Sequence, residues 1–124
     1  MNKQIIPKYH SSVFFVSDVE ISKKFFTDIL GQKIESDFGR CVIFTGGFSI
    51  WDRNYAHKMM SLPDEDISTN KKDAELYFEI EDIDSLYNKL KNEKTGSVHD
   101  IIEQPWGQRC FRIYDPDNHI IEFA

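Results

Sequence analysis

The fold is decided by residues 109–123, which read RCFRIY, then the turn DPDN, then HIIEF. Residues 40–51 repeat this arrangement in a shorter form, as RCVIFT, the turn GG and FSIW. In each copy two runs of strand-forming residues flank a tight turn, which predicts a strand, a turn and a strand. A second repeat lies upstream of each copy, where VFFVSDV at 13–19 matches YFEIEDI at 77–83. The chain is therefore predicted to be an internal duplication, with a cleft at the seam between modules.

Each half of the duplication is predicted to be a βαβββ module. Apolar residues at helical spacing follow the capping residues Asp18 and Asp82, and Gly31 and Gly96 close the two helices. The predicted strands of the first module cover residues 9–16, 32–37, 40–45 and 48–53 around a helix through Ile21, Phe25 and Ile29. Those of the second cover 75–81, 97–103, 108–114 and 119–123 around a helix from Ile83 through Leu90.

The predicted organisation is a single α+β domain of two tandem modules that form curved mixed sheets. Module one covers about 9–53 and module two about 74–124, and the 124 residues suffice for one core. Residues 54–73 carry Pro63, the acidic trio 64–66 and two lysines, without a period of 2 or 3.6. We therefore interpret 54–73 as a linker or lid and not as a further element of structure.

Composition limits the classes of partner. The net charge of −6 and the absence of a basic stripe argue against nucleic acid and against anionic membrane surfaces. The opening residues lack an apolar segment of signal-peptide length and no window resembles a membrane span, so we expect a cytoplasmic protein. Ten Phe, five Tyr and two Trp predict an aromatic core or pocket. Cys41 and Cys110 fall inside predicted strands and are interpreted as small buried hydrophobic residues.

The end of the chain carries a family resemblance. The run PWGQR at 105–109, a strand, the DPDN turn and the final IEF resemble the glyoxalase, bleomycin-resistance and extradiol-dioxygenase superfamily, also called the vicinal oxygen chelate fold. The resemblance covers the chain from about residue 9 and implies a homodimer with a ligand cleft between paired modules. The family's usual turn glycine is Asn118 here, and asparagine tolerates the positive φ that the turn requires.

The resemblance also implies four inward positions at which metalloenzymes of the family hold their ion. Counting from the Asp that ends each first strand, and comparing the last strands, places them at Ser11, Ser49, Glu75 and Glu122. Serine hydroxyls are poor ligands at neutral pH, and two carboxylates alone hold a hard ion loosely. No cofactor is therefore expected, although a divalent metal stays possible.

Two alternatives stay open at these positions. A bulge in the first strand would turn His10 inward, and His10, Glu75 and Glu122 would then form a metal triad. Glu122 is either a ligand-binding carboxylate or general base, or a structural partner of Arg109, Arg112 or Tyr114. The remaining histidines are interpreted as solvated at 57 and 99, and as a rim residue at 119.

Aromatic residues are predicted to line the cleft. Trp51 shares the face of Ser49, and Phe15 and Tyr77 point inward by the same alternation. Trp106 lies in a loop before the last hairpin, where aromatic side chains often gate a cleft. The predicted ligand-binding residues are Ser11, Phe15, Ser49, Trp51, Glu75, Tyr77, Trp106, Arg109 and Glu122.

These residues favour one function over another. An aromatic groove with carboxylates suits a flat cationic or amphipathic organic molecule, so we expect a metal-free binding protein similar to the bleomycin-resistance branch. The alternative is a metal-dependent lyase or transferase that resembles glyoxalase I or the fosfomycin-modifying enzymes. A catalytically silent partner domain is a third possibility.

Overall fold

The structure, a computed structural model, describes residues 5–62 and 73–124 and contains two βαβββ modules. Module one consists of β1 (Ser12–Val16), α1 (Val19–Lys24) with its π-helical continuation η1 (Phe25–Ile29), β2 (Ile34–Asp37), β3 (Cys41–Phe44) and β4 (Phe48–Asp52). Module two consists of β5 (Glu75–Phe78), α3 (Ile83–Asn92), β6 (Gly96–Glu103), β7 (Arg109–Tyr114) and β8 (Ile120–Phe123). The predicted duplication is confirmed.

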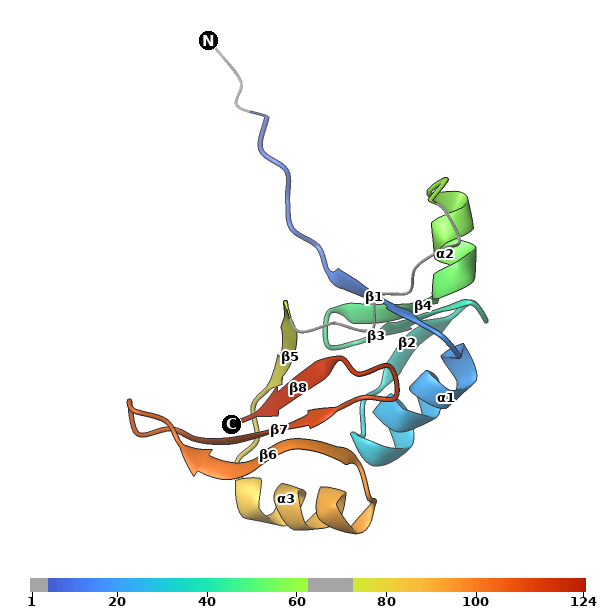
Figure 1. Cartoon of the computed structure of the whole chain (residues 1–124). Coiled ribbons are helices and arrows are strands. Elements are labelled where there is room, and N and C mark those ends of the chain that lie inside the picture. Colours follow the sequence, from blue (N-terminus) through green and yellow to red (C-terminus); the bar gives the residue numbers. More distant parts are fainter. Residues whose placement is uncertain (1–4, 63–72) are drawn as a thin grey trace.

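Each module forms one mixed four-stranded sheet with the same strand order. Sheet A runs β1-β4-β3-β2 and sheet B runs β5-β8-β7-β6. In both, the first and last strands of the module pair parallel and the other pairs are antiparallel. Figure 1 shows α1 beneath sheet A and α3 beneath sheet B, so one face of each sheet carries no covering module helix. We call these the open faces.

The helix of module one begins and ends as the sequence predicts, but its second half is wider than an α-helix. The Asp18 side chain accepts a hydrogen bond from the Ile21 amide at 3.1 Å, and Gly31 ends the helix at a φ of +65°. Within η1 the Leu30 amide bonds the Phe25 carbonyl five residues back. None of the helices in the described ranges has the length and apolar character of a membrane span.

One hydrophobic core joins the two modules on the helix side of the sheets. The Phe48 and Phe78 rings, one from each module, meet edge to face with centroids 6.0 Å apart. The fully buried side chains at its centre are Val16, Phe26, Val42, Phe44, Ile50, Leu90, Phe111 and Ile121. Because alternate strand residues enter this core, the residues between them lie on the open faces.

A short helix corrects the interpretation of residues 54–73. Helix α2 (Arg53–Met59) begins directly after β4, with Asp52 as its N-cap, and stands above sheet A in Figure 1. Arg53 reaches across to module two, where its guanidinium lies 3.2 Å from the Asp117 carboxylate, and it also donates to the Phe15 carbonyl. This tertiary anchor stabilises a helix too short to be detected by periodicity. The acidic trio and Pro63 lie outside the described residues.

We predict that Arg53→Met destabilises the fold strongly. The side chains of Arg53 and Asp117 are only 11% and 6% exposed, so the substitution leaves a buried carboxylate without its Arg53 cation. The expected loss is about 3–5 kcal/mol in the free energy of unfolding, measured by urea denaturation. Arg109→Met is the control, because its ion pair with Asp84 is solvent-exposed and should matter far less. Equal effects of the two substitutions would contradict the anchoring role of Arg53.

Candidate functional site

The open face of sheet A forms a groove. Cross-strand register places Val13, Ser49 and Ile43 in one row and Phe15, Trp51 and Cys41 in the next. The groove has a volume of about 500 Å³, within the range of small-molecule sites. The residues lining it are His10, Ser11, Val13, Glu35, Phe38, Cys41, Ile43, Phe44, Thr45, Gly47, Phe48, Ser49 and Trp51.

Aromatic rings continue from the groove to α2. The Phe15 ring makes edge contacts with Trp51 at 6.1 Å and with His57 of α2 at 5.6 Å between centroids. Trp51 in turn contacts Tyr55 at 6.2 Å, and the guanidinium of Arg40 lies 4.4 Å from the centre of the Tyr55 ring. Because α2 is anchored to module two, these contacts fix the orientation of the Trp51 indole at the groove.

The groove is mostly apolar with few polar groups. Ser11 and Ser49 supply hydroxyls, and Glu35 is the one formally charged side chain among the described lining residues. Burial raises the pKa of the Cys41 thiol, which favours the neutral form. The arrangement can therefore enclose an apolar or aromatic group, accept or donate hydrogen bonds through two hydroxyls, and attract a positive charge at one rim.

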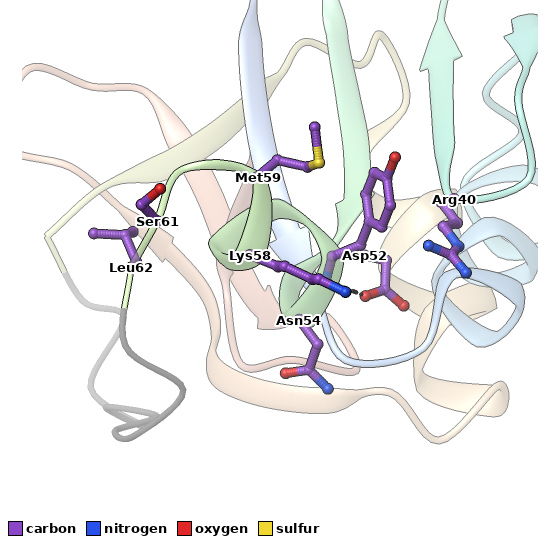
Figure 2. Close-up of a pocket in the computed structure, with 8 residues that line it drawn as sticks. Arg40, Asp52, Asn54, Lys58, Met59, Ser61 and Leu62 are labelled. Carbon is purple, nitrogen blue, oxygen red and sulfur yellow. Dashed lines mark hydrogen bonds between the residues drawn. The ribbon is translucent and has the colours of Figure 1, made fainter.

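A larger hollow beside α2 has a different character. Figure 2 shows Arg40, Asp52 and Lys58 around it, with the Lys58 ammonium directed toward the Asp52 carboxylate. Its volume is about 1370 Å³, but Arg40, Asn54, Lys58 and Met59 are exposed surface side chains. Asp52 is already engaged as the α2 cap. We therefore locate the candidate site in the smaller groove, where most of the lining residues belong to β1, β2, β3 and β4.

A polar row crosses the open face of sheet B. His99 of β6 pairs with Arg112 of β7, which pairs with Glu122 of β8, which pairs with Tyr77 of β5. Arg112 donates from Nη2 to Glu122 Oε1 at 2.8 Å and from Nη1 to His99 Nε2 at 2.9 Å. Its Nε lies 3.3 Å from Glu75 Oε1. One guanidinium thus binds side chains from the three other strands of the sheet.

These contacts determine the protonation of His99. A guanidinium has only donors, so Nε2 of His99 must accept the hydrogen bond from Arg112. The other ring nitrogen, Nδ1, lies 2.7 Å from the carbonyl oxygen of Asp100 and donates to it. In this arrangement Nδ1 of His99 carries the proton and Nε2 presents its lone pair to Arg112.

The two carboxylates of the row differ in environment. The Glu122 side chain is 11% exposed and accepts a hydrogen bond of 2.8 Å from Arg112. The Glu75 side chain is 34% exposed, and its two oxygens lie 3.3 and 3.5 Å from Nε of Arg112. Burial raises the pKa of Glu75 and the neighbouring Glu122 raises it further, against the lowering effect of Arg112. The sequence left Arg109, Arg112 and Tyr114 as candidate partners of Glu122, and Arg112 is the one that bonds to it.

These donors do not fit a metal ion as the chain stands. The lone pairs of Glu75, Glu122 and His99 are directed at the Arg112 guanidinium, a cation that a metal ion would have to displace. Within the described ranges no three His, Cys, Asp or Glu side chains are gathered for coordination. His10, the alternative ligand, lines the groove of sheet A, with Nδ1 3.4 Å from Ser11 Oγ, and not the polar row.

The other predicted site residues are divided between the faces. Ser11, Ser49 and Trp51 line the groove together, whereas Glu75, Tyr77 and Glu122 share the open face of sheet B. Phe15 contacts Trp51 where the groove meets α2. Arg109 lies apart from both sets, since it forms a bidentate pair with Asp84 of α3 at 3.0 and 2.9 Å.

The loop aromatic is linked to sheet B. Trp106 is 71% exposed, and its indole nitrogen donates to Gln108 Oε1 at 3.1 Å. Gln108 donates through Nε2 to the Tyr77 hydroxyl, also at 3.1 Å.

His119 binds the buried Asp115 carboxylate at 2.8 Å. The prediction that His99 is solvated was wrong, because the His99 side chain is partly buried and bonds to Arg112.

Sequence reasoning missed His99 and Glu35, and it left Arg112 as one of three candidate partners of Glu122. Counting outward from the DPDN turn would have paired Arg112 with Glu122, as the register shows. His99 was hidden because β6 contains register shifts on both sides of it, which break simple alternation. Glu35 lies within a similar irregularity of β2, between Ile34 and Ser36, and had no signal of its own.

Comparisons with known proteins agree with this architecture. A sequence model of the glyoxalase-like domain matches residues 9–124. A protein of unknown function from Agrobacterium tumefaciens str. C58 is 33% identical, with 97% of this chain and 94% of that chain covered and a TM-score of 0.87. The chain has no significant match among curated proteins.

More distant structures share the fold alone. A glyoxalase/bleomycin resistance protein/dioxygenase from Nocardioides is 20% identical, with 97% and 84% of the two chains covered and a TM-score of 0.77. A lactoylglutathione lyase from Agrobacterium tumefaciens is 17% identical, with 95% and 93% covered and a TM-score of 0.72. With nearly the whole chain matched by the family's sequence model, this protein belongs to the glyoxalase-like domain family of the vicinal oxygen chelate superfamily.

Proposed function

We propose that this protein binds a flat organic cation, or an amphipathic molecule with a cationic group, without a catalytic metal. The observation that carries the proposal is the sheet A groove, which presents Trp51 and two serine hydroxyls in a volume of about 500 Å³. An aromatic face attracts a cation through the ring quadrupole, and an apolar floor favours a flat ring system.

Charge supports a cation over an anion. Glu35 lies at the groove, and its carboxylate adds a negative potential to that of a chain with net charge −6. On sheet B, Arg112 offsets only one of the two carboxylates that it contacts when both are ionised. Both open faces therefore favour positive ligand groups.

A second copy of the chain would complete the site. The groove is bounded by sheet A on one side only, and exposed apolar side chains on sheet B include Tyr77 at 49% and Ile102 at 43%. A twofold axis that sets sheet A of each copy against sheet B of the other would cover the open faces of both copies and form two equivalent contacts. The proposed assembly is a homodimer with two equivalent clefts.

The assembly is tested by light scattering at micromolar concentration. We predict twice the chain mass, because burying two open faces per copy removes apolar surface from water. Val13→Glu places a charge in the groove row of sheet A, where Val13 is 47% exposed, and should shift the equilibrium toward monomer. A monomeric wild-type protein at these concentrations would contradict the dimeric cleft.

Ligand binding is tested with thioflavin T, a flat benzothiazolium cation, and its neutral parent 2-(4-dimethylaminophenyl)benzothiazole. In a Trp106→Phe variant, Trp51 is the sole tryptophan. The cation should quench Trp51 fluorescence on binding, since it stacks on or beside the indole. If neither dye gives saturable quenching, the proposed function is overturned.

The contribution of Glu35 is tested with the same dyes. Glu35→Gln should lower the affinity for the cation roughly two- to fivefold, as expected for one exposed charge pair, and leave the affinity for the neutral parent unchanged. Glu93→Gln removes an equal charge at the far end of α3 and is the control. If both variants weaken the cation equally, the effect is one of net charge and Glu35 does not select the ligand.

A further inference from the structure

Three metal-type donor groups converge on one side chain of the protein. Oε1 of Glu122, Nε2 of His99 and Oε1 of Glu75 lie 2.8, 2.9 and 3.3 Å from three different nitrogens of the Arg112 guanidinium. They come from β8, β6 and β5, so the convergence is a property of the whole sheet and not of one loop. A further donor atom, Sγ of Cys110, lies 3.8 Å from Nη1.

His99 presents to the cluster a lone pair of the kind that binds metals. The tautomer of His99 leaves the Nε2 lone pair directed into the cluster, as in an imidazole that binds a transition metal. Carboxylates and neutral imidazole are each groups that bind Zn²⁺, Mn²⁺ or Fe²⁺. The group that these ligands surround, however, is a guanidinium that cannot be deprotonated in a protein.

We infer that Arg112 is a built-in cation, which supplies among Glu75, Glu122 and His99 the positive charge that a divalent ion could supply only if these side chains, which do not form a metal-binding group as they stand, closed around it. It neutralises part of the carboxylate charge, orients the three side chains and excludes a metal. The inference concerns sheet B alone and does not depend on the ligand of the sheet A groove.

Electrostatics predicts what removal of the guanidinium would do. Glu122 raises the pKa of the neighbouring Glu75, and Arg112 opposes that effect. Without Arg112 the two carboxylates and the His99 lone pair would share a partly buried space with no positive charge between them. An external divalent ion would then restore the missing charge and gain ligands as these side chains move inward from positions in which they do not form a metal-binding group.

The decisive variant is Arg112→Ala, with zinc chloride as the probe. Wild-type protein should show no change in melting temperature with zinc or with chelator. Arg112→Ala should melt lower than wild type and regain roughly 5 °C or more when zinc is at a hundredfold excess over its dissociation constant. By calorimetry, the variant should bind zinc at least tenfold more tightly than the wild type.

Matched controls identify the ligands. Arg109→Ala removes an arginine from the opposite face of the same strand and should gain no zinc binding. In the Arg112→Ala background, adding Glu122→Gln or His99→Ala should abolish the zinc-dependent rise. If the rise persists in both double variants, zinc binds elsewhere and the inference fails.

Two measurements cover the case in which Arg112→Ala does not fold. Arg112→Lys keeps a cation at the centre and should remain folded without gaining zinc affinity. In wild-type protein, the Arg112 Nε–H signal in a nitrogen-15 NMR spectrum should be unmoved by millimolar zinc. Zinc stabilisation of the wild type, displacement of that signal, or a folded Arg112→Ala protein with no gain in zinc affinity would overturn the inference.

Discussion

Each sheet of this protein has two faces, and the module helices cover only one of them. The constraint follows from the duplication, because α1 and α3 occupy equivalent positions and the two halves share a single core on the helix side. Strand alternation then directs every second residue of eight strands to the opposite faces. The character of those open faces decides what the protein can bind, since the core itself is filled by its own aromatic side chains.

The two open faces meet this constraint in different ways. Sheet A leaves a mostly apolar groove whose polar groups include the Ser11 and Ser49 hydroxyls and the Glu35 carboxylate. Phe15 and Trp51 contact each other where the groove meets α2. Sheet B carries a polar row across all four strands, in which Arg112 bonds to side chains of the other three. A partly buried arginine bonded on three sides stabilises its partners only if all remain in place, so this face is expected to be rigid. The duplicated fold thus provides one surface suited to ligand contact and another suited to fixed charge.

Local patterns predicted the fold because each turn and cap carried its own signal. Gly31 and Asn118 adopt the positive φ values of +65° and +66° that their positions suggested, and the two βαβββ modules followed from the repeated hairpins. Helix α2 escaped prediction because its stability comes from the Arg53–Asp117 ion pair, which joins residues 64 positions apart. Ser49 and Trp51 could be placed on the open face by strand alternation alone. The contact of His99 with Arg112 could not be predicted in this way, because β6 has an irregular register. Arg109 and Arg112 lie three residues apart on one strand and face opposite sides, so only the register distinguishes their roles.

We propose that the open faces of two copies form the ligand site, whose polar side is organised by a protein cation and not by a metal. A crystal structure of the wild-type protein grown with both thioflavin T and zinc tests this claim most directly. We expect the dye against Trp51, sheet B of a second copy across the groove, and Arg112 still bonded to Glu122. Dye bound elsewhere with the groove facing solvent, or zinc between Glu75 and Glu122 with Arg112 displaced, would contradict it.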